Sequence, residues 1–164
     1  QAEDGIRDVE RSRGLGDVYK RQIYALKTIR KKLNNKGIKL AGLENQIMKN
    51  GFFEFVKNNT HDVMMPDVKY SGGPDEMIEL DKFFSKHDIE FSPHNPSGPI
   101  AHAHSIQICS VSTPCLLEYQ YKESDKFDSI INLSNTPIIN SKVRTIASEK
   151  GLGVSINMEN LLKK

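Results

Sequence analysis

The chain has 164 residues; 37% of them are hydrophobic, 27% are charged, and the formal net charge is +2. This balance excludes an intrinsically disordered protein, which combines few apolar residues with a high net charge, and it provides no basic field for nucleic acid. No run of about 18 apolar residues is present, so no membrane span is expected, and the two cysteines, Cys109 and Cys115, fit a reducing compartment such as the cytoplasm.

The first 22 residues differ in composition from the rest of the chain. They contain four of the six arginines, Arg7, Arg11, Arg13 and Arg21, and they lack both a wide apolar face and the apolar stretch of a signal peptide. Parts of the segment resemble translated sequencing-adapter DNA. We therefore expect residues 1–22 to be either a non-native tail or a natural disordered arm, with no stable structure in either case.

From residue 23 onward, segments with helical and with extended spacing of apolar residues alternate along the chain. The spacing predicts helices over 23–33, around 52–56, over 77–84 and over 100–111, and strands over 38–44, 63–68, 89–92 and 115–121. Alternation of this kind is typical of an α/β fold with a parallel sheet built from strand–helix units. After residue 121 the chain becomes polar, and we expect only short strands within 136–146 and a last helical turn at 158–162.

Four polar residues lie at or near the carboxyl ends of the predicted strands: Glu44, Asp67, His94 and Glu118. Their separations of 23, 27 and 24 residues each correspond to one strand–helix unit. In an α/β barrel the carboxyl ends of all strands open on one face, where the active site lies. The alternation of side chains along a strand puts Glu44 on the same side of the first strand as Gly42, so we expect the four polar groups to converge. Taken singly, Glu44 could be a helix cap, Asp67 an Asx turn and His94 a loop residue.

Several ordered motifs make a family resemblance specific. The segments AGLENQ, MMPDVKYSGG, FSPHNPSGP and LLEYQY, with GLGV near the end, resemble the C-terminal half of the enolase superfamily. The likeness is to its mandelate racemase and muconate-lactonising branch, and within that branch to the galactonate-type sugar-acid dehydratases. The resemblance implies the last four strands and outer helices of a (β/α)8, TIM-like barrel over residues 23–121. Residues 122–164 would then form an extension toward a capping domain that has no counterpart in this sequence.

The resemblance also implies a role for each polar residue. Glu44 matches a carboxylate ligand of Mg²⁺, and Asp67 and His94 match an Asp–His dyad. Glu118 matches the glutamate that hydrogen-bonds the substrate carboxylate as it becomes an enediolate. Asn95, next to His94, either contacts the substrate or caps its loop. The residues do not decide whether His94 acts as the base or as the acid that protonates a departing β-hydroxyl.

This residue set fits the Mg²⁺-dependent removal of a proton α to a carboxylate. Mg²⁺ takes oxygen ligands and stabilises the negative charge that accumulates, while a histidine exchanges protons near neutral pH. We therefore expect part of a sugar-acid dehydratase, a lyase, that acts on a small molecule, binds neither nucleic acid nor a membrane, and is homo-oligomeric as a whole. The alternatives are a racemase or epimerase of the same superfamily and a non-catalytic half-barrel. Since the family's other metal carboxylates and its second-strand acid–base residue have no match in this sequence, we expect the chain alone to be inactive.

Overall fold

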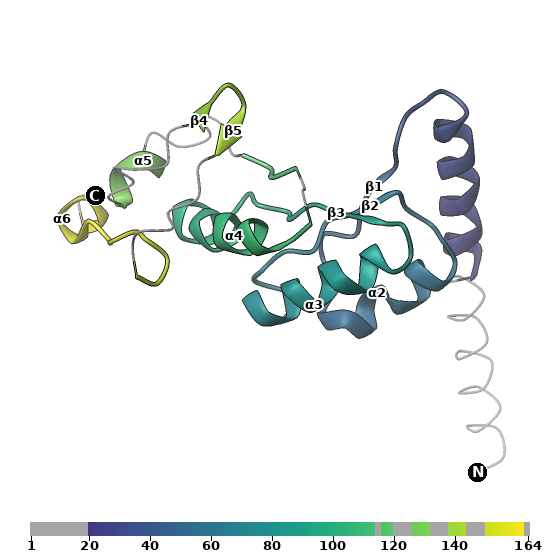
Figure 1. Ribbon diagram of the computed structural model, residues 1–164, viewed down its shortest axis with the longest axis horizontal. Coiled ribbons are helices and arrows are strands. Elements are labelled where there is room, and N and C mark those ends of the chain that lie inside the picture. The colour runs from purple at the N-terminus through teal and green to yellow at the C-terminus, as the bar shows by residue number, and fades with distance from the viewer. Residues whose placement is uncertain (1–19, 114–115, 120–125, 132–137, 144–149, 163–164) are drawn as a thin grey trace, which may run out of the picture.

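The computed structural model describes residues 20–113, 116–119, 126–131, 138–143 and 150–162 (Figure 1). A first helix covers residues 20–34, so it includes the last residues that we assigned to the tail, and residues 1–19 lie outside the described part. The helix ends in a Schellman motif, in which the N–H of Ile38 donates to Leu33 O at 3.1 Å and the N–H of Gly37 donates to Asn34 O at 2.9 Å. Gly37 has a φ of 73°, which glycine adopts without strain, so the helix stops here.

The centre of the fold is a parallel sheet of three short strands in the order β1–β2–β3. The strands are β1 (Ala41–Gly42), β2 (Val63–Met64) and β3 (Glu90–Phe91). A helix follows each strand: α2 (Met48–Lys57), α3 (Pro74–Ser85) and α4 (Pro99–Val111). The register pairs Gly42 with Met64, and a separate parallel bridge joins Asp67 to His94 further along. The predicted α/β class with parallel strand–helix units is therefore confirmed.

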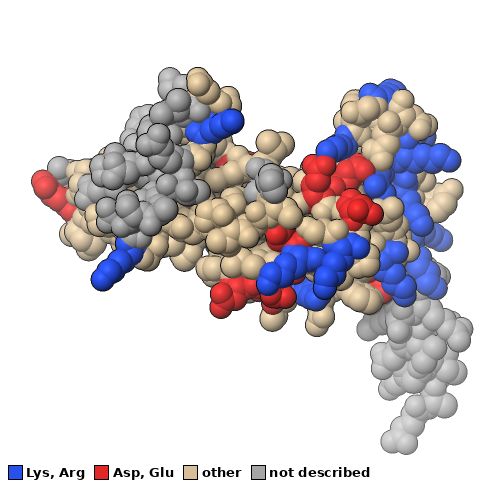
Figure 2. All heavy atoms as spheres, in the orientation of Figure 1, with Lys and Arg blue, Asp and Glu red and all other residues tan. Residues whose placement is uncertain are grey.

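The apolar core lies on the face of the sheet that α2 and α3 cover (Figure 1). Apolar side chains at helical spacing are buried on both helices: Phe52, Phe55 and Val56 on α2, and Met77, Leu80 and Phe84 on α3. Phe52 and Phe84 meet edge-on with their ring centroids 5.2 Å apart, and Met64 of β2 is fully buried in the same cluster. In the view of Figure 2 the outline of the molecule dips over the strands, and acidic side chains lie at this dip.

The strands are shorter than predicted because one proline and one left-handed residue interrupt the ladder. Leu43, which has a φ of 73°, follows β1 directly. Pro66 has no backbone N–H to donate, so regular pairing ends soon after β2. Pro93 lies between Ser92 and His94, whose N–H groups still donate to Met64 O and Pro66 O. The sequence predicted the places of the strands correctly, but their ladders extend over two residues each.

The segment predicted as a fourth strand, 115–121, is held in a different way. In its described part no residue is in a strand. Instead, Ser92 Oγ donates to Leu116 O at 2.9 Å, and Asn95 Nδ2 donates to Glu118 O at 2.8 Å. The segment therefore lies beside the chain that follows β3, as the fold requires, but side chains rather than a backbone ladder hold it there.

Beyond residue 125 the described segments form small elements: α5 (Phe127–Ile130), β4 (Ile138–Ile139), β5 (Lys142–Val143) and α6 (Met158–Leu162). They confirm the predicted short strands and last helical turn. β4 and β5 pair antiparallel around Asn140 and Ser141, whose φ angles of 51° and 59° suit a two-residue hairpin turn. The ring of Phe127 lies 6.0 Å from those of Tyr119 and His102, so aromatic contacts join α5 to α4. Within the described ranges, no helix is long and apolar enough to cross a membrane.

Candidate active site

Asp67 and His94 lie side by side just past β2 and β3, where a parallel bridge joins their backbones. His94 Nδ1 is 3.1 Å from Asp67 Oδ2, and the N–H of His94 donates to Pro66 O at 3.0 Å. Only 1% of the Asp67 side chain is exposed. Its other oxygen, Oδ1, accepts the backbone N–H of Lys69 at 2.8 Å, which is an Asx turn. Asp67 therefore shapes its loop with one oxygen and faces His94 with the other.

Glu44 reaches the same histidine from the loop that follows β1. Its Oε2 lies 3.3 Å from His94 Nε2, and 46% of the Glu44 side chain is exposed. A neutral imidazole has one N–H and donates to one carboxylate, whereas an imidazolium has two and donates to both. Each ring nitrogen of His94 therefore faces a carboxylate oxygen, Nδ1 that of Asp67 and Nε2 that of Glu44.

The path by which Glu44 reaches His94 differs from the predicted one. Gly42 pairs with the buried Met64, and a Cβ on Gly42 would lie 3.3 Å from the buried His61 Nε2. Gly42 therefore faces the core side of the sheet, and the expectation that it shares a side with Glu44 was wrong. Leu43, in the left-handed region, lies between them and breaks the alternation. This one backbone angle directs Glu44 toward the site.

Lys69 is a neighbour of the pair that our sequence analysis did not single out. Its Nζ lies 3.5 Å from Asp67 Oδ2, the oxygen that also faces His94, and 4.8 Å from the ring centroid of Tyr70. The ammonium group thus partly balances the buried carboxylate. Lys69 lies in the turn that follows Asp67, so the alternation of side chains along a strand gave no signal for this contact.

Glu118 lies beside the loop that contains His94. Its Oε2 accepts the backbone N–H of Asn95 at 2.9 Å, and its backbone oxygen accepts the Asn95 side chain at 2.8 Å. Asn95 is 2% exposed, and its side chain also contacts His102 and Ser105. The structure thus brings Glu44, Asp67 and His94 into contact and places Glu118 at the residue next to His94. A contact between Asn95 and a substrate stays a prediction, and the structure gives this side chain partners within the protein.

The chain is similar in sequence to known proteins. The sequence model of the family described as "Enolase C-terminal domain-like" matches residues 18–160. The chain belongs to this family. D-galactonate dehydratase from Xanthomonas campestris pv. campestris (strain B100) is 32% identical over 108 residues, which are 62% of this chain and 28% of that enzyme. D-galactonate dehydratase from Verminephrobacter eiseniae (strain EF01-2) is 27% identical over 108 residues. The domain therefore spans 28% of the length of these relatives.

Two solved structures show the same fold. A mandelate racemase/muconate lactonizing enzyme-like protein from Rubrobacter xylanophilus DSM 9941 has a TM-score of 0.73 and 23% identity, over 84% of this chain and 34% of its own. The 3,6-anhydro-D-galactonate cycloisomerase from Zobellia galactanivorans has a TM-score of 0.69 and 22% identity, over 76% of this chain and 35% of its own. The enolase C-terminal-like domain is thus part of a TIM barrel from the C-terminal half of the superfamily, as the motifs predicted.

The described residues of this enolase C-terminal-like domain do not make a metal site on their own. Among them, no group of three or more His, Cys, Asp or Glu side chains could hold a metal ion. Glu44 offers the oxygen donors that Mg²⁺ prefers, but its Oε2 is turned to His94. Glu44 thus offers the type of donor that Mg²⁺ prefers, but the described residues offer too few donors to hold the ion.

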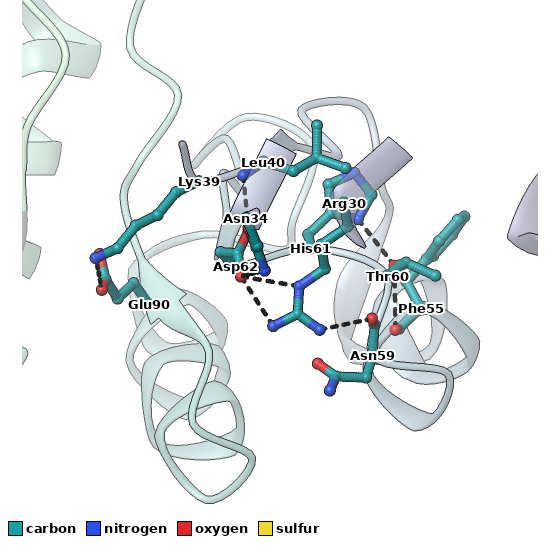
Figure 3. A network of polar contacts seen from close by, with 10 residues as sticks. All are labelled: Arg30, Asn34, Lys39, Leu40, Phe55, Asn59, Thr60, His61, Asp62 and Glu90. Atoms are coloured by element: carbon teal, nitrogen blue, oxygen red, sulfur yellow. Dashed lines mark hydrogen bonds and ion pairs between the residues drawn. The ribbon is translucent and has the colours of Figure 1, made fainter. Parts of the chain in front are cut away.

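A second polar cluster lies at the opposite, amino ends of the strands and joins the first helix to the sheet (Figure 3). Asp62 is at its centre: Oδ1 accepts Arg30 Nε at 2.8 Å and Asn34 Nδ2 at 3.1 Å, and Oδ2 accepts the N–H of Leu40 at 2.7 Å. Burial by itself would raise the pKa of Asp62, but these hydrogen bonds outweigh it and hold the pKa below its usual value.

His61 belongs to the same cluster and is buried next to Asp62. Its Nδ1 lies 2.8 Å from Thr60 Oγ1. Burial lowers the pKa of His61, the charge of Arg30 lowers it further, and Asp62 opposes both. In TIM barrels the active site lies at the carboxyl ends of the strands, whereas the amino ends contribute to stability. We therefore interpret this second cluster as structural.

Proposed function

We propose that this chain is part of an enolase-superfamily enzyme, a sugar-acid dehydratase, that removes the proton α to a carboxylate and expels the β-hydroxyl. The contact of 3.1 Å between His94 Nδ1 and Asp67 Oδ2 carries the proposal. It gives an oriented imidazole at the edge of the sheet where barrel active sites lie. The 32% identity to a D-galactonate dehydratase supports a polyhydroxy acid as the substrate class.

His94 is the group that moves the proton. Its Nδ1–H donates to Asp67, so Nε2 is the nitrogen that exchanges a proton with the substrate. Nε2 takes the α-proton if His94 is the base, or delivers a proton to the departing hydroxyl if it is the acid. Both roles need the ring to be held in one tautomer, which the charge-assisted hydrogen bond to Asp67 provides.

Lys69 acts on the reaction through Asp67. Its Nζ and His94 Nδ1 face the same oxygen, at 3.5 and 3.1 Å. A positive charge at that distance partly balances the buried carboxylate that orients the imidazole.

Glu118 and Glu44 would help to stabilise the negative charge that develops on the substrate. Glu118, when protonated, would donate a hydrogen bond to the substrate carboxylate as it becomes an enediolate. Glu44 would be one oxygen ligand of a Mg²⁺ ion, with the other ligands supplied from outside the described residues. Because 46% of the Glu44 side chain is exposed, its carboxylate is accessible to such an ion.

The test is turnover by the full-length enzyme that contains this chain, supplied with Mg²⁺ and a set of stereoisomeric sugar acids that includes D-galactonate. Dehydration produces a 2-oxo-3-deoxy acid, whose carbonyl is detected as a hydrazone. We expect Asp67→Asn and His94→Gln each to lower kcat by about 10²–10⁴-fold. His87→Gln, at an exposed histidine on the turn after α3, is the matched control and should leave kcat unchanged.

The outcomes separate the candidate reactions. No turnover of any sugar acid by the unsubstituted enzyme would refute the dehydratase proposal. Deuterium incorporation at the α-carbon in D₂O without loss of water would instead identify a racemase or epimerase. Full activity of His94→Gln would remove His94 from the chemistry in either case.

A further inference from the structure

Asn95, His102 and Ser105 form a buried polar cluster between Glu118 and the body of α4. The three residues are at most 3% exposed. Asn95 Nδ2 lies 2.8 Å from Glu118 O and 2.6 Å from His102 Nδ1, and Ser105 Oγ donates to Asn95 Oδ1 at 3.3 Å. Both ends of the Asn95 amide are therefore held inside the protein.

The backbone oxygen of Glu118 determines which way this amide points. A carbonyl oxygen can only accept, so Asn95 must turn its NH₂ group toward Glu118. The reversed amide would bring two oxygens within 2.8 Å of one another. The same NH₂ group meets Nδ1 of His102, so Nδ1 must accept. His102 is therefore neutral, with its proton on Nε2.

Glu118 depends on this cluster for its position. In the described part of its segment, no strand ladder holds the backbone. The backbone N–H of Asn95 donates to the Glu118 carboxylate at 2.9 Å, and the Asn95 side chain binds the Glu118 backbone oxygen. Asn95 thus binds both the backbone and the carboxylate of Glu118. The acceptor nitrogen of His102 in turn fixes the side chain of Asn95.

We propose that Asn95 and His102 are positioning residues that hold Glu118 beside His94, with His102 acting as the acceptor for the Asn95 amide. The inference rests on the proposed function in one respect, namely that Glu118 contacts the substrate. A buried hydrogen-bonded network of this kind favours a single arrangement, and a carboxyl group that is displaced by about 1 Å loses much of its effect on a reaction.

Two substitutions at His102 separate positioning from packing. His102→Asn keeps an acceptor close to the place of Nδ1, whereas His102→Leu fills the space without one. In the full-length enzyme we expect His102→Leu to lower kcat by about 10–10²-fold with KM changed by less than about threefold. His102→Asn should keep kcat within about threefold. Equal losses in the two variants, or no loss in either, would overturn the inference.

A second measurement needs no substrate. Long-range ¹H–¹⁵N NMR spectra distinguish the two histidine tautomers, and the signal of His102 is the one missing from His102→Asn. We expect the proton on Nε2, and a proton on Nδ1 would overturn the inference even in an active dehydratase. A proton on Nε2 in an enzyme that turns over no sugar acid would support the positioning of Glu118 and overturn only the proposed function.

Discussion

Replacing Asp62 by alanine removes the group that joins the first helix to the sheet. In the folded chain its carboxylate accepts hydrogen bonds from Arg30, Asn34 and the backbone of Leu40. Alanine leaves these donors without that partner and does not touch the apolar core. We therefore expect Asp62→Ala to lower the free energy of unfolding while the native fold is kept.

The size of the effect follows from the contacts. A hydrogen bond to a charged group contributes about 1.5–3 kcal/mol, and a buried donor left unpaired costs about 1–3 kcal/mol. These contributions do not add within one network, and Arg30, with 20% of its side chain exposed, regains some hydration. The expected loss for Asp62→Ala is about 2–4 kcal/mol.

The ion pair between Lys39 and Glu90 provides the matched control. It lies in the same region (Figure 3), but its side chains are 60% and 56% exposed. Glu90→Ala should therefore lower the free energy of unfolding by less than about 1 kcal/mol.

Urea unfolding of the 164-residue chain and its variants, followed by circular dichroism, measures both losses. A double-mutant cycle of Asp62→Ala with Arg30→Met should give a coupling energy of about 1–3 kcal/mol. Equal losses for Asp62→Ala and Glu90→Ala, or a coupling close to zero, would refute the reasoning, because Asp62 would then behave as an ordinary surface charge.

The hydrogen bonds of Asp62 also predict how the stability of the chain changes in acid. The pKa of Asp62 is lower in the folded chain than its ordinary value of 3.8, so the unfolded chain binds the proton first as the pH falls. The stabilisation by Asp62 is complete at pH values above the ordinary pKa. It is lost as the pH falls through the lower pKa that Asp62 has in the folded chain. The difference in stability between the unsubstituted chain and Asp62→Ala should be constant near neutral pH and shrink below about pH 4.

Three further substitutions test the core, the buried histidine and the proposed metal ligand. Phe84→Ala should lower the free energy of unfolding by about 3–5 kcal/mol in urea titrations because it leaves a cavity, whereas Phe53→Ala, at an exposed position, should change it by less than about 1 kcal/mol; similar losses would contradict the assigned core. Burial is the main cause that lowers the pKa of His61 below its ordinary 6.5, so stability should fall as the pH drops below that value, and His61→Gln should remove this part of the profile. An unchanged profile would argue against a buried neutral ring. In the full-length enzyme, Glu44→Gln should raise the Mg²⁺ concentration for half-maximal activity at least about tenfold, and no change would exclude Glu44 as a ligand.

The contact between Asp67 and His94 was predictable from the sequence because local signals determine it. Each residue follows a short apolar strand, and one helix of ordinary length separates the two strands. Parallel strands in register then bring their carboxyl ends together. The bridge between the two residues keeps the register of β2 and β3, although Pro66 precedes the first and Pro93 the second.

Other features depend on side-chain contacts between distant segments, which the sequence pattern does not encode. The attachment of Glu118 through Asn95 and His102 depends on where α4 packs. The cluster around Asp62 joins residues that are 22 to 32 positions apart, and no periodicity predicts such a contact. In the described part of the predicted strand over 115–121, side chains of the neighbouring segment bind the backbone in place of a ladder.

The direction of the Glu44 side chain depends on the backbone conformation of Leu43, which is not one of the proposed reactive residues. Leucine tolerates the left-handed backbone at modest strain, whereas a β-branched side chain strongly disfavours it. Glycine would adopt it easily but would lose the apolar side chain that packs on the core. A substitution of leucine by valine or isoleucine, conservative by hydrophobicity, should therefore move the Glu44 carboxylate away from His94 while both side chains stay in the sequence.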